Sequence, residues 1–196
     1  MTGKREITRD DIMDIDAYAK VRREQRREAV SLKRNRRVEV GPVAAFYFEN
    51  YATMWHQVHE MLHIERGGEA QIADELAAYN PLIPNGRELI ATVMFEIDDE
   101  TRRRTFLARL GGVEATAFLR FDGETVAGVP EVDVDRTTAA GKASAVQFIH
   151  FAFSDAQIAK FCAPGTQVII GFEHPNYSHM AVMSEAVRAA LAEDFD

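Results

Sequence analysis

The chain has 196 residues, of which 46% are hydrophobic, so its length suits one domain with a buried core, residues 1–196, rather than two. A single cysteine excludes an intramolecular disulfide, and the lack of an apolar run of about 18 residues or of an N-terminal leader predicts a cytoplasmic protein with no membrane partner. The net charge of −8 is uneven, because residues 1–41 hold 12 Lys/Arg and 8 Asp/Glu whereas residues 42–196 hold 11 and 23.

This charge distribution predicts a basic helical arm, residues 1–35, in front of an acidic body, residues 36–196. Thr8 supplies an N-cap, and apolar residues recur at helical spacing to about Lys33. Within residues 20–37, nine basic side chains face two acidic ones, without a nucleic-acid motif or interleaved aromatic residues. We therefore expect the arm to contact protein rather than nucleic acid: the chain's own body, a second subunit or another protein. The residues expected to bind are Arg22, Arg23, Arg26 and Arg27.

The rest of the chain alternates predicted strands with helices. Two strands, 36–40 and 44–49, flank a Gly-Pro turn and lead into a pair of helices, the second over Glu69–Tyr79. Further strands are predicted at 89–97, 114–121, 125–129, 145–153 and 167–172, and short helices at 100–110, 155–161 and 185–193. Hairpins and short helical connections indicate an α+β fold: an antiparallel sheet packed with helices, preceded by a long basic N-terminal helix and a histidine-bearing helical hairpin.

The first helix of that hairpin contains an H-E-x-x-H motif, in which His59 and His63 stand one turn apart and Glu60 lies beside them. Two such imidazoles can bind one zinc ion, and the glutamate can act as the base for a metal-bound water. Assuming about 100° per residue, the histidines lie away from the helix's apolar stripe. They therefore either face water, as a solvated surface, or line a cleft covered by another part of the fold.

A third metal ligand is missing from the local sequence. Arg66 and Glu69 occupy the positions where a metzincin has Gly and His, and a loop stands where a gluzincin supplies its glutamate. Asp74 or Glu75 on the second helix of the hairpin could complete a site instead. A predicted loop, residues 173–179, offers further candidates, because it combines two histidines with a tyrosine.

The candidate metal site has a defined set of residues. The proposed ligands to Zn, Fe or Mn are His59, His63, Glu75, His174 and His179, and the proposed catalytic groups are Glu60 as base and Tyr177 as proton donor. The sequence thus leaves two functions open. One is a non-hydrolytic accessory protein that binds a partner, and the other is a metal-dependent enzyme, a zincin-like hydrolase or another type. The sequence contains no Gly-rich phosphate loop, serine nucleophile elbow or C-x-x-C pair that would support another mechanism.

Several short motifs resemble a bacterial family catalogued as domain of unknown function 3501. They are Asn-Arg-Arg-Val-Glu-Val-Gly-Pro at 35–42, Phe-Glu-Asn at 48–50, Glu-Met-Leu at 60–62, Tyr-Asn-Pro-Leu-Ile-Pro at 79–84, Leu-Gly-Gly at 110–112 and His-Pro-x-Tyr at 174–177. The resemblance spans nearly the whole chain. It implies an accessory role in redox or oxidative-stress metabolism. It also implies that relatives have Gln and Arg-like residues in place of His59 and His63 while retaining Glu60 and Met61.

Overall fold

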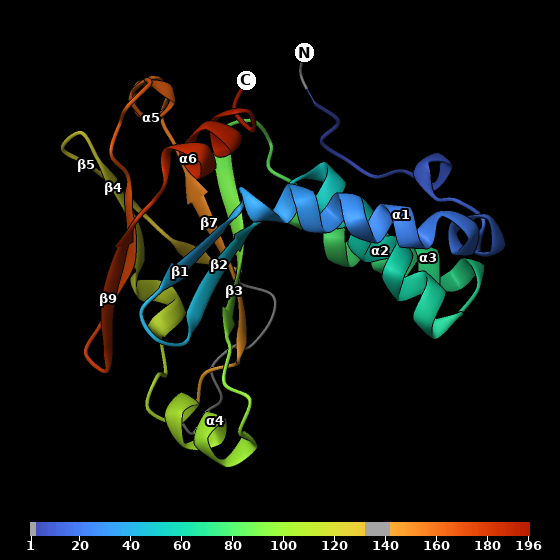
Figure 1. Cartoon of the computed structure of the whole chain (residues 1–196), viewed down its shortest axis with the longest axis horizontal. Coiled ribbons are helices and arrows are strands. Elements are labelled where there is room, and N and C mark those ends of the chain that lie inside the picture. The colour runs from blue at the N-terminus through green and yellow to red at the C-terminus, as the bar shows by residue number, and fades with distance from the viewer. Residues whose placement is uncertain (1–2, 132–141) are drawn as a thin grey trace.

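The computed structural model describes residues 3–131 and 142–196, and within these ranges the strands form two antiparallel sheets. The first contains, in order across the sheet, β1 (Arg37–Val40), β2 (Ala44–Phe48), β3 (Glu88–Phe95), β7 (Val146–Ala152) and β6 (Val129–Pro130). The second contains β5 (Glu124–Ala127), β4 (Ala117–Phe121), β8 (Ile169–His174) and β9 (Tyr177–Val182). Figure 1 shows the two sheets on one side of the molecule and a group of helices on the other.

The main core lies between the two sheets. Alternate residues of each strand point inward, as expected for strands with one face on a core. The cluster, called here the sandwich cluster, includes Phe46, Phe48, Leu89, Val93 and Phe95 from the first sheet and Leu119, Phe121, Ile170 and Phe172 from the second. The short helices α4 (Glu100–Leu107), α5 (Asp155–Cys162) and α6 (Glu185–Ala192) connect or follow the strands at the ends of the sandwich (Figure 1).

A second core holds the longer helices α1 (Ile15–Arg34), α2 (Tyr51–Glu65) and α3 (Glu69–Tyr79). This helical cluster consists of Ile7, Ile12, Met54, Val58, Leu62, Leu82, Ile83 and Ile90, with Trp55 and Phe148 among the partly buried residues packed against it. Because Ile90 and Phe148 belong to β3 and β7, the helices rest on the outer face of the first sheet. The fold is therefore α+β with a helical hairpin that carries the histidines, as predicted, although the strands divide into two sheets.

The predicted N-terminal helix is interrupted near its start. Thr8 begins only a short 3-10 turn, η1 (Arg9–Asp11), and α1 starts at Ile15, where the Asp14 side chain accepts hydrogen bonds from the next helical amides. Between them, Ile12 is buried in the helical cluster. Burial of this side chain against α2 draws the segment out of the helical path, which periodicity within the segment could not show.

Two strand predictions also needed correction. Residues 173–179 form no loop: β8 continues to His174, and β9 returns from Tyr177 after a tight turn, with these two residues paired. The predicted strand 125–129 is divided at Gly128, where the chain passes from the second sheet to the first. A Cβ at Gly128 would lie 2.6 Å from the side chain of Ile149, so only glycine fits this crossing.

Two further 3-10 turns, η2 (Asn80–Leu82) and η3 (Val113–Thr116), connect the remaining elements, and η3 replaces the first residues of the predicted strand 114–121. None of the helices within the described ranges is both long enough and apolar enough to cross a lipid bilayer.

Candidate functional site

The histidine-bearing face of α2 is covered by α1. The Tyr18 hydroxyl donates a hydrogen bond to Oε1 of Glu60 at 2.8 Å, and Arg22 donates from Nε and Nη2 to the two carboxylate oxygens at 2.8 and 2.9 Å. The Arg22 guanidinium lowers the pKa of Glu60 to about 2, against the smaller opposing effect of burial. A carboxylate with so low a pKa is a weak base. In this structure Glu60 joins two helices and is poorly suited to accept a proton from water.

His59 is buried and has both ring nitrogens occupied. The backbone amide of Met13 donates to Nε2 at 3.0 Å, so the proton of the neutral ring is on Nδ1, which donates to the carbonyl of Trp55 at 2.7 Å. The Trp55 ring covers it at a centroid distance of 3.9 Å, and burial lowers the pKa of His59. A metal could reach His59 only if its hydrogen bond with Met13 or Trp55 were broken.

The remaining candidates on the helical hairpin do not form a three-ligand group with His59. His63 has a buried Nδ1 without a hydrogen-bond partner, and its ring lies 6.1 Å from that of Tyr18. Glu75 is buried on α3, where it accepts a hydrogen bond from Gln71 at 2.9 Å. Across residues 3–131 and 142–196, no three His, Cys, Asp or Glu side chains are grouped closely enough to hold a metal ion.

Tyr177 holds the turn between β1 and β2. Its hydroxyl donates to the carbonyl of Val40 at 2.6 Å and accepts from the amide of Ala44 at 3.1 Å, and its side chain is buried. Burial raises the pKa of this tyrosine. Gly41, in the same turn, has a positive φ of 68°, and a Cβ there would lie 2.8 Å from the Tyr177 hydroxyl. These contacts give Tyr177 a structural role at this corner of the sandwich.

The two C-terminal histidines lie with Tyr177 on the second sheet. His174 accepts a hydrogen bond from the amide of Asn176 at its Nδ1, so its Nε2 donates to the carbonyl of Gly111 at 3.2 Å. The ring of His179 packs against Tyr177 at a centroid distance of 4.5 Å. Figure 1 shows β9 and α2 on opposite sides of the molecule. The structure therefore does not bring His174 and His179 to the H-E-x-x-H motif.

The outward face of α1 is strongly basic. Five of its side chains are exposed and are called here the cationic face: Lys20, Arg23, Arg26, Arg27 and Arg34. None of them forms an ion pair with a residue in the described part of the chain, whereas Arg22, one position before Arg23, is bound to Glu60. A shallow hollow of about 620 Å³ runs along this face and includes Val30, which is 67% exposed.

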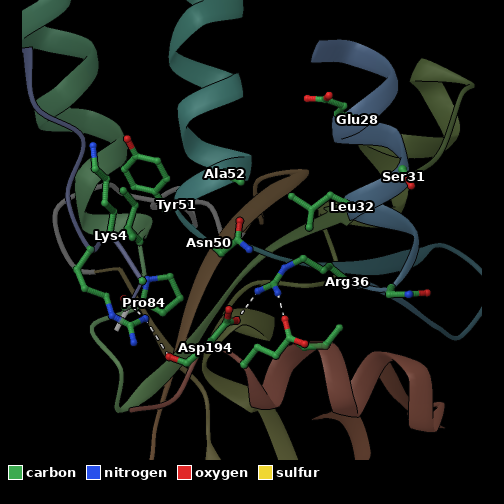
Figure 2. A pocket seen from close by; sticks show the side chains of 16 residues that line it. Lys4, Glu28, Ser31, Leu32, Arg36, Asn50, Tyr51, Ala52, Pro84 and Asp194 are labelled. Carbon is green, nitrogen blue, oxygen red and sulfur yellow. Dashed lines mark hydrogen bonds and ion pairs between the residues drawn. The ribbon is translucent and has the colours of Figure 1, made fainter. Parts of the chain in front are cut away.

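A larger cavity of about 690 Å³ lies where the helices meet the sandwich. Figure 2 shows Arg36 on its floor, between the end of α1 and Asp194. Arg36 is buried, forms an ion pair with Asp194 and donates to the carbonyls of Phe48 at 2.9 Å and Glu49 at 3.0 Å. The two buried charges are paired with each other, and together with the two backbone hydrogen bonds they connect the C-terminal segment to the end of β2.

The fold and these contacts define an α+β protein with a two-sheet sandwich, a helical layer and a basic helix on its surface. The chain belongs to the family described as Protein of unknown function (DUF3501), whose model matches residues 6–195. This confirms the resemblance seen in the sequence motifs. The chain is also similar to a protein of unknown function from Burkholderia pseudomallei whose crystal structure is known. The two are 42% identical, each is covered completely, and the TM-score is 0.90. No curated protein matches the chain.

Proposed function

We propose that this protein is a cytoplasmic, non-hydrolytic accessory protein that binds an acidic surface of a protein partner through the cationic face of α1. The observation that carries the proposal is the exposure of four arginines within about three helical turns that form no ion pair with a carboxylate in the described part of the chain, whose net charge overall is −8. The family resemblance implies that this accessory role belongs to redox or oxidative-stress metabolism.

Electrostatic repulsion between the arginines of the cationic face supports the proposal. Arginines three or four positions apart on one helix repel each other, and each such pair destabilises a helix by roughly 0.2–0.5 kcal/mol. Arg23 is spaced in this way from both Arg26 and Arg27, and none of the three forms an ion pair with a described residue. An acidic partner would supply the missing charges. Arg22 differs, because Glu60 already binds its guanidinium.

The test begins by finding the partner and continues by measuring its affinity. A photo-crosslinking side chain at position 27 would trap the neighbouring protein in the native cytoplasm, and the captured protein would then be purified. We expect the Arg23/Arg26/Arg27→Ala variant to bind it about tenfold more weakly at low salt, since each exposed ion pair contributes roughly 0.2–1 kcal/mol. High salt should reduce this difference in affinity, because the Debye screening length shortens to about 3 Å at 1 M salt.

An Arg102/Arg104→Ala variant is the control for loss of exposed arginines elsewhere, because both lie on a different helix, α4. It should bind like the wild type. Equal affinity of the wild type and the α1 variant for the purified partner would contradict the proposal, as would a crosslink to nucleic acid. A crosslink between two copies of this chain, with a dimer in sedimentation that the α1 variant loses, would assign the acidic surface to a second subunit.

A further inference from the structure

A separate pocket of about 410 Å³ lies between the outer face of the first sheet and the helical layer. The exposed arginines of the cationic face do not line this pocket. Most of its wall is apolar and consists of Met54, Leu82, Met94, Val146 and Phe148, with Tyr79 beside them. The volume falls within the range of roughly 300–1,000 Å³ typical of small-molecule sites.

The pocket contains one buried carboxylate with an unsatisfied oxygen. Glu49 is 5% exposed; its Oε1 accepts a hydrogen bond from the Thr92 hydroxyl at 2.7 Å, and its Oε2 has no hydrogen-bond partner. Its backbone is fixed, because the carbonyl accepts from Arg36 and the amide donates to the carbonyl of Ile90 at 2.8 Å. Among the described residues nothing donates to this oxygen, so it is available to accept a hydrogen bond from a bound water or ligand.

A positive charge lines the same pocket. Lys33, in the last turn of α1, is half-buried and forms no ion pair with Glu49 or with any other residue that the structure describes. The pocket therefore presents one acid and one base, neither of them in an ion pair with a described residue, beside an apolar wall. A carboxylate and an ammonium group that line one pocket together with an apolar wall match a small zwitterion that carries an apolar group.

We propose that this pocket binds an amino acid or a similar zwitterion with an apolar side chain. The ammonium group donates to Oε2 of Glu49, the carboxylate faces Lys33, and the side chain packs against Met54, Leu82 and Phe148. This binding is independent of the partner that the cationic face recognises.

L-phenylalanine, L-leucine and L-methionine are suitable probes, with binding followed by NMR shifts of the methionine methyl groups and by calorimetry. We expect at least one to bind at or below about 10 mM, and Glu49→Gln to weaken that binding at least about tenfold, since hydrogen bonds to charged groups are the strong ones. For the aromatic probe, 2-phenylethylamine and 3-phenylpropanoate each lack one charge and should bind more weakly than L-phenylalanine. Lys33→Met should abolish the advantage of L-phenylalanine over 2-phenylethylamine.

Two control variants and one blocking variant separate loss of binding from loss of fold. Glu88→Gln changes another partly buried carboxylate on β3, and Lys20→Met changes an exposed lysine on α1; neither lines the pocket, so both should bind normally. Met94→Trp adds bulk at a partly exposed position of the lining and should prevent binding while the circular dichroism spectrum is retained. Failure of all three amino acids to bind up to about 10 mM would overturn the proposal. Binding unaffected by Glu49→Gln, or 2-phenylethylamine binding as tightly as L-phenylalanine, would do the same.

Discussion

Glu60 illustrates how a residue in a catalytic-looking motif can serve the fold. We expect Glu60→Gln to lower the free energy of unfolding by about 2 kcal/mol, because the charge-assisted hydrogen bonds from Arg22 and Tyr18 are weakened. Chemical denaturation near neutral pH measures this difference. Glu65→Gln, on the same helix, is the control, because its exposed side chain has no ion pair among the described residues.

The same contact predicts a pH dependence at acid pH. The pKa of Glu60 lies near 2 in the folded protein, below its ordinary value of 4.5, so the unfolded chain binds a proton first. The stabilisation by Glu60 is therefore complete above pH 4.5 and is lost as the pH falls from 4.5 towards 2. The stability difference between wild type and Glu60→Gln should shrink across this window, and a constant difference would contradict the assignment.

His59 should make the fold sensitive to mildly acidic pH. Burial lowers its pKa below 6.5, so the unfolded state binds the proton more readily and stability falls as the pH drops below 6.5. His59→Asn should be less stable at pH 8 by roughly 1–3 kcal/mol, since the Met13 amide and the Trp55 carbonyl lose a partner, but its stability should change less with pH. Urea denaturation at a series of pH values measures both. An unaltered pH slope in the variant would disprove this role.

The hydrogen bonds of His59 also lead to a prediction about metal content. Because both nitrogens of His59 are engaged, we expect protein purified without a histidine tag to contain less than about 0.1 equivalent of Zn, Fe or Mn. Elemental analysis measures this directly. Near-stoichiometric metal that disappears in both His59→Ala and His63→Ala would instead overturn the accessory role in favour of the metal-dependent alternative.

At the scale of elements, Tyr177 joins the β8–β9 hairpin to the β1–β2 turn. Tyr177→Phe should lower the free energy of unfolding by roughly 1–3 kcal/mol, because the Val40 carbonyl and the Ala44 amide lose their partner inside the fold. Hydrogen exchange of the Ala44 amide should accelerate in this variant. Tyr47→Phe is the comparison, because its hydroxyl bonds to Glu96 near the surface, and its stability loss should be smaller.

For the whole molecule, we propose that the helical layer and the sandwich unfold together as one domain. Trp55 reports on the helical cluster, and the thiol of Cys162, the only cysteine, reports on the sandwich cluster against which it packs. We expect tryptophan fluorescence and thiol accessibility to change at the same denaturant concentration, because Ile90 of β3 belongs to the helical cluster and Phe148 of β7 packs against it. Arg36→Ala should lower the free energy of unfolding by about 3–5 kcal/mol, as reported by both probes. Fluorescence that changes at a clearly lower denaturant concentration than thiol accessibility in the wild type would indicate two domains.

The sequence by itself determined the elements and the family. Local periodicity and capping residues predicted the α2–α3 hairpin and most strands, since these signals act over a few residues. The motifs that carried the resemblance also meet in space: Arg36 bonds to the carbonyls of Phe48 and Glu49, and Tyr177 bonds to Val40. These contacts hold the fold, which explains why the motifs identify a family without naming an activity.

Only the tertiary structure decided what the polar residues do. The H-E-x-x-H motif places His59 and Glu60 on one helix, but Met13 and Arg22, which occupy their polar atoms, come from a segment more than thirty residues away. In the sequence, Glu49 is only the last residue of an apolar strand. Its unsatisfied oxygen becomes apparent only in the fold, where α2 and α3 cover the sheet and bury the side chain. Hydrogen bonding and burial depend on neighbours distant in sequence, so residue spacing alone cannot separate a catalytic group from a structural one.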